Sequence, residues 1–184
     1  DAVLKGITPE EDWQVLYDCI VYGTENVHPE VSSSGRLGHE YYNSIGYIPC
    51  NVGINESVAR TLEYAYNDWC IYQMGKKLGR PANETDIYKQ RSQNYKNVFH
   101  PKFGMMSGRD SKGNFPEDFK PDAWWGPFTE GNSWHWTWCV FHDIRGLINL
   151  MGGNKAFTNK LDAVFTTPPT FGGNVDTRKQ LIHE

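Results

Sequence analysis

A long amphipathic stretch that begins at Ser57 limits the fold more than any other feature of this sequence. Its apolar side chains recur every three or four residues and share one wide helical face: Val58, Leu62, Ala65, Tyr66, Trp69, Cys70 and Met74. Gly79 and Pro81 end the pattern, because glycine leaves a helix easily and proline cannot continue one. We therefore predict a long helix within a mainly α fold.

Two shorter helical patterns flank this stretch. The first begins at Thr8, which we expect to cap a helix and to form a capping box with Glu11, and it ends at Gly23. The second covers about residues 85–98. Between the first pattern and Ser57, residues 24–55 have little helical period, and we interpret them as a long, functional connection.

The C-terminal half predicts further helices. One is expected to begin just after Glu130, and Asp143 and Asn154 are candidate N-caps of two more. The last helix should be closed by the Pro-Pro and Gly-Gly pairs within residues 168–173. The turn-forming residues 110–113 predict a small β-hairpin over residues 103–116. Helices joined alternately by short and long connections fit antiparallel pairs wrapped in a ring, whose long loops gather at one end.

Bulk composition excludes some classes of protein. The 184 residues carry a net charge of −4 and no basic cluster, which disfavours nucleic acid and anionic membranes as partners. No apolar stretch approaches the roughly 20 residues of a membrane span. Because the chain begins at Asp1 without methionine, we expect a processed or excised piece.

The four cysteines are far apart and lack zinc-site spacing. Three of them, Cys19, Cys70 and Cys139, lie beside apolar residues in helical patterns. We favour buried free thiols over disulfides for these cysteines, with the disulfide alternative open.

Five of the seven tryptophans lie between Trp124 and Trp138, with Glu130 among them. Such a block is either a packed core or an aromatic-walled cleft. In a cleft, Trp125 and its neighbours would stack on the C–H faces of a sugar, and Glu130 would act as a general acid. In a core, Glu130 would be an exposed residue at a helix N-terminus.

Other chemistries find little support. His135 and His142 are seven residues apart, too far along one helix to share a metal ion. The glycines of residues 104–113 do not form a phosphate-binding pattern, and Ser133 and His135 would face different sides of a helix.

Several long motifs resemble glycoside hydrolase family 92, a family of calcium-dependent, inverting, exo-acting α-mannosidases. They are GYIP (46–49), ESVARTLEYAYNDWCI (56–71), RSQNYKNVF (91–99), FTEGNSWHWTW (128–138) and HDIRGLINLMGG (142–153). The resemblance implies an N-terminal β-sandwich followed by an (α/α)6 barrel. Residues 1–184 would be one partial barrel segment, without the β-sandwich and without the C-terminal part of the barrel.

The resemblance also implies roles for individual residues. Glu130 falls on the catalytic acid. Asn132 and Trp134 would line the mannose subsite together with Trp125, and Asn132 would belong to the surroundings of a Ca²⁺ whose main ligands lie outside this chain. Two positions depart from the family, with His135 in place of glutamine and Phe141 in place of proline.

The family's general base, an aspartate, belongs to a downstream segment that these residues do not contain. We therefore expect a secreted or periplasmic parent enzyme that removes α-1,2-linked mannose from glycans, and an inactive isolated chain. The alternative is a non-catalytic carbohydrate-binding or structural helical fragment.

Overall fold

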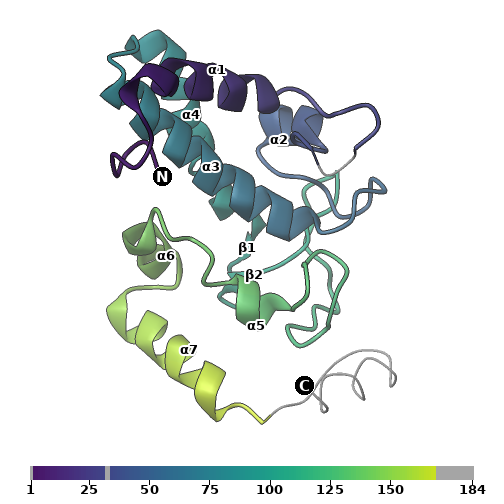
Figure 1. Cartoon of the computed structure of the whole chain (residues 1–184). Coiled ribbons are helices and arrows are strands. Elements are labelled where there is room, and N and C mark those ends of the chain that lie inside the picture. The colour runs from purple at the N-terminus through teal and green to yellow at the C-terminus, as the bar shows by residue number, and fades with distance from the viewer. Residues whose placement is uncertain (1, 32–33, 169–184) are drawn as a thin grey trace, which may run out of the picture. The chain divides into compact units, whose positions relative to one another are not determined.

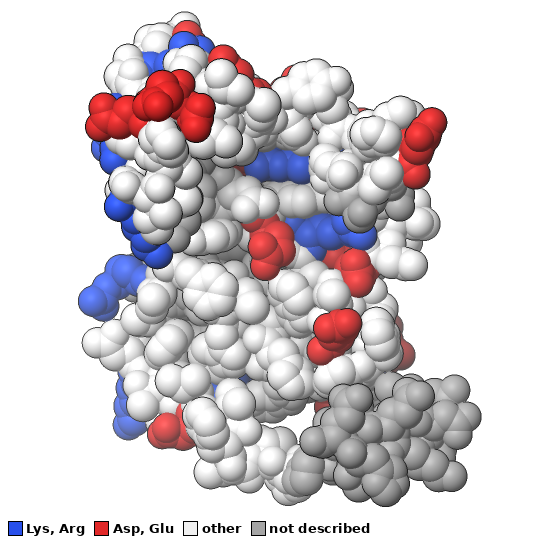
Figure 2. Space-filling view, viewed as in Figure 1, with Lys and Arg blue, Asp and Glu red and all other residues white. Residues whose placement is uncertain are grey.

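The computed structural model describes residues 2–31 and 34–168, which divide between two units (Figure 1). Unit 1 comprises residues 1–48 and 60–97, and unit 2 comprises residues 49–59 and 98–184. On the face shown in Figure 2, acidic and basic side chains are interspersed. No helix in the described part of the chain is long and apolar enough to cross a membrane.

Unit 1 is helical. It contains the 3-10 turn η1 (Glu10–Asp12), α1 (Trp13–Gly23), α2 (His39–Ile45), α4 (Ala82–Arg91), nearly all of η2 (Asn94–Val98) and most of α3 (Ser57–Lys77), the long helix that the sequence predicts.

The core of unit 1 forms where α1 and α4 meet α3. Its buried apolar side chains are Val3, Tyr17, Ile71, Met74 and Tyr88. The helices approach closely at Gly75, because a Cβ there would lie 2.6 Å from Cγ2 of Thr85 and 3.1 Å from the Tyr17 hydroxyl. A side chain at this position would push the elements apart.

A second part of the unit 1 interior is polar. Asp68 is fully buried on α3, and its Oδ1 lies 2.7 Å from Nη2 of Arg36. The Tyr42 hydroxyl donates to Oδ2 of Asp68 at 2.9 Å, and the Arg36 guanidinium lies 5.2 Å from the ring centre of Tyr64. Because buried charges must be paired, this network fixes residues 36–42 against α3.

Two predictions for unit 1 are wrong. Thr8 forms no capping box; its hydroxyl accepts the indole N–H of Trp13 at 3.0 Å, and the chain enters α1 through a 3-10 turn behind Pro9. The segment 24–55 is not all connection, because it contains α2. This helix has only seven residues, and the left-handed glycines Gly38 and Gly46 bound it, so its pattern is too short to show a period.

The described residues 98–168 of unit 2 form a two-stranded antiparallel sheet and the helices that follow it: β1 (Phe99–His100), β2 (Met105–Met106), α5 (Ser133–Trp136), α6 (Ile144–Leu150) and α7 (Asn154–Thr166). Phe99 pairs with Met106, and His100 pairs with Met105. Helix α5 is joined to β2 because Met106 donates its N–H to the Thr137 hydroxyl at 3.0 Å and accepts the Ser133 hydroxyl with its carbonyl.

The expected hairpin exists, but its position was wrong. The strands lie at 99–100 and 105–106, before most of the predicted segment. The turn-forming residues beyond them form a separate turn, in which Oδ1 of Asp110 accepts the backbone N–H groups of Lys112 and Asn114 at 2.9 and 2.8 Å. The Asp110 carboxylate therefore accepts backbone N–H groups that a neighbouring strand would accept in a hairpin.

The predicted caps had mixed outcomes. Asp143 caps α6, because its Oδ1 accepts the N–H of Gly146 at 2.9 Å. Asn154 is the first residue of α7 rather than its cap, and the cap position is Gly153, without a side-chain bond. Helix α7 ends at Thr166, and residues 169–173 of the predicted stop lie outside the described residues.

Cys19, Cys70 and Cys139 are free thiols, as predicted, and Cys50 is also a free thiol. The expected burial is wrong for Cys19, which is exposed on α1, whereas Cys70 and Cys139 are half-buried. Cys50, for which no burial was predicted, is exposed in unit 2.

Candidate active site

Glu130 occupies a strained turn that directs its side chain outward. Its φ is +44°, in the left-handed region that costs a non-glycine residue roughly 1–2 kcal/mol. Glu130 is exposed, while the next three residues, Gly131, Asn132 and Ser133, are all buried. The turn therefore keeps its own backbone inside unit 2 and presents the carboxylate.

Three contacts hold the turn in this conformation. The indole N–H of Trp136 donates to the carbonyl of Thr129 at 2.8 Å, and the backbone N–H of Trp125 donates to the carbonyl of Gly131 at 3.1 Å. Gly131 also lies close to the helix, since a Cβ there would stand 3.3 Å from Nε1 of Trp136. Residues on both sides of Glu130 are thereby fixed, which maintains the strain at Glu130.

Asn132 caps helix α5. Its Oδ1 accepts the N–H of Trp134 at 3.0 Å, and His135 closes a capping box from the third helical position. Nδ1 of His135 lies 3.3 Å from the backbone nitrogen of Asn132 and 2.9 Å from Oδ1 of Asn132. When Nδ1 carries no proton, it accepts the backbone N–H of Asn132. When Nδ1 carries the proton, it donates to Oδ1 of Asn132. Histidine thus closes the box at a position where glutamine would also do so.

The tryptophans mainly brace this turn and its helix. Trp138 donates its indole N–H to the carbonyl of Trp134 at 2.8 Å, and the Trp134 ring lies 5.5 Å from Nζ of Lys160 on α7. Trp124 meets His135 edge-on at 5.5 Å. Four of the five rings are half-buried, and Trp125, at 50% exposure, is open. The tryptophan block is therefore mainly packed against its surroundings, and Trp125 is its exposed ring.

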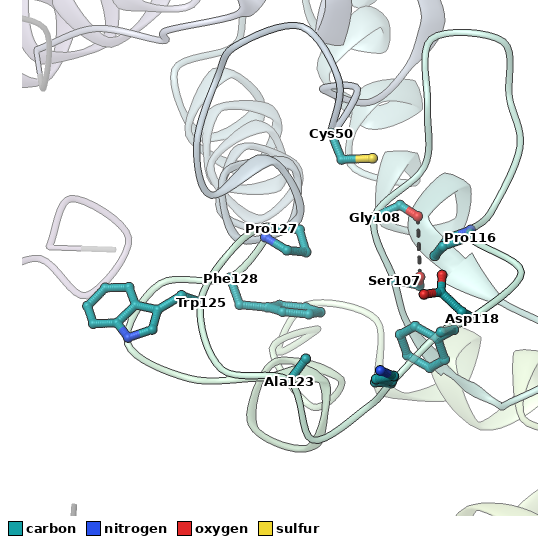
Figure 3. A pocket seen from close by; sticks show the side chains of 11 residues that line it. Cys50, Ser107, Gly108, Pro116, Asp118, Ala123, Trp125, Pro127 and Phe128 are labelled. Carbon is teal, nitrogen blue, oxygen red and sulfur yellow. Dashed lines mark hydrogen bonds between the residues drawn. The ribbon is translucent and has the colours of Figure 1, made fainter. Parts of the chain in front are cut away.

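A cavity of about 310 Å³ lies in unit 2, and Trp125 is among the residues that line it (Figure 3). Cys50, Phe119 and Phe128 also line it. The sequence did not indicate Cys50, because it comes from a segment far from the tryptophan block and joins it only through the fold. The aromatic composition of residues 115–128 was the one available indication.

Asn132 does not fit the metal role by itself. Its Oδ1 is engaged in the helix cap, its Nδ2 lies 3.4 Å from the carbonyl of Asp122, and the residue is only 4% exposed. Within residues 2–31 and 34–168, no three histidine, cysteine or carboxylate side chains gather as a metal site. Calcium prefers six to eight oxygen ligands, which these residues do not assemble.

A sequence model described as the glycosyl hydrolase family 92 catalytic domain matches residues 1–183, and the chain belongs to that family.

Several known proteins are similar to this chain in sequence or in structure. The chain is 32% identical to an uncharacterized secreted glycosidase of Arthroderma benhamiae, over 95% of this chain and 26% of the relative. It is 44% identical to the family GH92 inverting mannosidase BT2199 of Bacteroides thetaiotaomicron, with a TM-score of 0.79 over 88% of this chain and 22% of that one. The GH92 α-mannosidase BT3965 of the same species is 34% identical, with a TM-score of 0.79 over 90% and 21%.

These likenesses confirm the predicted fold class, a mainly helical segment with a small β-hairpin of the kind found in (α/α)6 barrels. The chain spans about a quarter of the curated relative and about a fifth of the solved mannosidases that it matches.

Proposed function

We propose that this chain carries the general acid of an inverting, exo-acting α-mannosidase, and that Glu130 is that acid. The parent protein would release mannose, in α-1,2 linkage, from glycans. Support comes from membership of family 92 and from 44% identity to an inverting mannosidase. The observation that carries the assignment is the turn itself, which presents Glu130 from an otherwise buried backbone.

In this mechanism Glu130 donates a proton to the glycosidic oxygen as the bond to the anomeric carbon breaks. Inversion requires a second carboxylate that activates a water on the opposite face of the sugar, about 6.5–9.5 Å from the first. The family resemblance assigns this base to an aspartate outside the chain. Both catalytic groups would therefore be present only in the complete catalytic domain.

The neighbouring residues have supporting roles in the proposal. Trp125 offers the open aromatic face for a sugar ring, whereas Asn132 fixes the start of α5 behind the acid. Trp134, half-buried beside Lys160, would contact sugar with the edge that remains open. A Ca²⁺, if bound in the parent, would help to bind and orient the sugar hydroxyls, and its ligands would come from beyond this chain.

The test is the substitution Glu130→Gln in the complete catalytic protein. A general acid contributes about 10²- to 10⁴-fold, so kcat/KM for a mannobiose should fall by that order. A dinitrophenyl mannoside, whose leaving group needs no proton, should lose much less. Glu117→Gln removes another exposed carboxylate of unit 2 and serves as the matched control. Equal, small losses on both substrates would refute the assignment.

The isolated chain should release no mannose, because it lacks the base. Calcium-dependent mannose release by these 184 residues would contradict this prediction. The second candidate function is carbohydrate binding without catalysis. It would be favoured if the complete protein bound mannosides but hydrolysed none of them.

The proposal extends to the ligand and to the location of the protein. BT3965 has been solved with mannoimidazole, which favours mannose-containing glycans as substrates here. The curated relative is called secreted, and we propose a secreted or periplasmic parent.

A further inference from the structure

One wall of the cavity in unit 2 is a segment that contains neither helix nor strand, residues 115–120, which we call the wall segment. Two of its residues, Pro116 and Asp118, lie across the cavity from Trp125 (Figure 3). Within the described part of the chain, no backbone hydrogen bond joins residues 115–119 to the rest of the protein. The wall segment therefore depends on its side chains for attachment.

The aromatic side chains of the wall segment pack on His100 of β1. The imidazole stacks on Phe115, with ring centres 4.6 Å apart, and its centre lies 5.6 Å from that of Phe119. Phe103, in the turn between β1 and β2, meets the imidazole edge-on at 4.8 Å and Phe119 at 4.9 Å. Because Phe119 also lines the cavity, the ring of His100 supports the cavity wall from behind.

The position of His100 favours its neutral form. The residue is only 9% exposed, and its Nδ1 is buried without a hydrogen-bond partner among the described residues. Burial, followed by the charge of Lys102, lowers the pKa of the imidazole. A proton on this ring would therefore place a charge where neither water nor a hydrogen-bond acceptor can compensate for it.

The charges around the imidazole also oppose protonation. The charged side chains of the elements packed around it are Lys102, Arg109, Asp110, Lys112, Glu117, Asp118, Lys120 and Lys160. Nζ of Lys102 lies 5.4 Å from the ring centre of Phe103, and the Arg109 guanidinium lies 5.2 Å from that of Phe115. The two rings closest to the imidazole thus already have a cation against them, which a second positive charge would have to approach.

The remaining charges do not offset this effect. Lys160 of α7 adds a further cation, because its Nζ donates to the carbonyl of Phe103 at 3.0 Å. The carboxylate of Asp110 is occupied by the backbone N–H groups of its own turn. Glu117 and Asp118 are exposed to solvent, which weakens their attraction for a buried proton.

We propose that His100, Phe115 and Phe119 form an acid-sensitive latch, in which protonation of His100 releases the wall segment and opens the cavity. This inference goes beyond the proposed function, because it depends neither on Glu130 nor on what the cavity binds.

The direction of the pH effect follows from linkage. A group whose pKa is lowered in the closed latch binds its proton more readily when the latch is open. The closed state is therefore favoured above the ordinary histidine pKa of about 6.5 and loses this advantage as the pH falls below that value.

The test measures opening by proteolysis with endoproteinase Glu-C, which cuts after glutamate. Glu117 lies within the wall segment, between the two rings that pack on His100. Cleavage there requires an extended chain, so its rate follows the population of the open state. The complete catalytic protein is digested at about pH 7.5 and about pH 5.5, one unit on either side of the ordinary histidine pKa.

Peptide mass spectrometry quantifies the cut after Glu117. A synthetic peptide of residues 112–122, added to each digest, corrects for the pH dependence of the protease itself. We expect the corrected rate to rise severalfold at the lower pH. The ceiling is about tenfold, because an imidazole with the ordinary pKa is about nine-tenths protonated there.

Three variants test whether His100 is responsible. His100→Phe keeps an aromatic ring that cannot be protonated, so its cleavage should stay slow at both pH values. His100→Ala removes the ring, so its cleavage should be fast at both. His39→Gln removes a histidine of unit 1 and should behave as the wild type.

Two results would overturn the latch outright: no rise in the wild type, or an equal rise in His100→Phe. Loss of the far-UV circular dichroism signal of the wild type at the lower pH would also overturn it, because the whole protein would then be unfolding. The His100→Phe result decides the question even where His100→Ala does not fold.

Discussion

Removal of the Tyr42 hydroxyl should destabilise unit 1 by about 1.5–3 kcal/mol, the usual contribution of a hydrogen bond to a charged group. Tyr42 is fully buried, and its oxygen lies 2.9 Å from Oδ2 of Asp68 and 3.0 Å from the carbonyl of Arg91. Tyr42→Phe keeps the ring and nearly all of the packing. Its cost therefore measures the loss of the single hydroxyl proton, which lies within reach of both the Asp68 carboxylate and the Arg91 carbonyl.

Tyr64 provides a matched control within the same unit. Its ring meets that of Tyr42 edge-on at 5.5 Å, and its hydroxyl donates to the neutral carbonyl of Leu37 at 3.2 Å. Tyr64→Phe should therefore cost only about 0.5–1.5 kcal/mol. The difference between the two losses of unfolding free energy therefore measures the effect of the acceptor's charge.

The effect of Tyr42→Phe should also depend on pH. Burial, followed by the Asp68 charge, raises the pKa of Tyr42 well above its ordinary value. The folded state then keeps the proton that the unfolded state releases above about pH 10. Wild-type stability should therefore fall as pH rises through that value. The phenylalanine variant lacks this particular loss, so the gap between the two proteins should close by about 1.4 kcal/mol per pH unit.

The assay is urea-induced unfolding of all three proteins, followed by far-UV circular dichroism near neutral pH and again about one unit above the ordinary tyrosine pKa of about 10. A cost for Tyr42→Phe no larger than that for Tyr64→Phe would refute the argument from the buried carboxylate. A gap that stays constant at alkaline pH would refute the inference about ionisation.

Three further predictions concern other parts of the structure. Asn132→Ala should remove the cap of α5 and cost about 1 kcal/mol in urea unfolding, with faster hydrogen exchange at residues 133–136 as the local measurement. His100 is nearly buried against phenylalanine rings, and burial, then the charge of Lys102, lowers its pKa. The unfolded state therefore binds this proton more readily, so stability should fall as pH drops below about 6.5, and a His100→Gln variant should show a shallower acid slope. Gly75→Ala should cost about 1–3 kcal/mol through overpacking against Tyr17 and Thr85, whereas Gly23→Ala, which meets no neighbour and needs no left-handed backbone, should cost much less.

Hydrophobic periodicity in the sequence was sufficient to predict the long helix. The stripe that begins at Ser57 predicted α3, because a helix of 21 residues repeats its apolar face several times. Helix α2 was missed because seven residues contain fewer than two full repeats, and its ends are set by left-handed glycines. The misplaced hairpin has a related cause, since strands of two residues have no alternation to detect.

The sequence offered a candidate site residue but not the arrangement around it. The family resemblance of its motif gave Glu130 a proposed role, and the sequence also showed the aromatic character around it. The donation from the Trp136 indole to Thr129 could not be predicted, because a side-chain hydrogen bond to a backbone carbonyl has no fixed spacing. The contribution of Cys50 to the cavity depends on its backbone contact with Arg109, 59 residues further along the chain.

The contacts that hold Glu130 come mainly from its own stretch of chain. Besides the bonds from Trp125 and Trp136, the N–H of Ser133 donates to the carbonyl of Pro121 at 3.2 Å. Loop closure over so few residues costs little entropy, so a strained turn of this kind can be stabilised without distant partners. The tryptophans suit this task because each supplies a large apolar ring and one directed N–H donor. Under the proposed assignment of Glu130, this separates two tasks: one local segment would set the orientation of the acid, and the assembly of the whole domain would set the distance between acid and base.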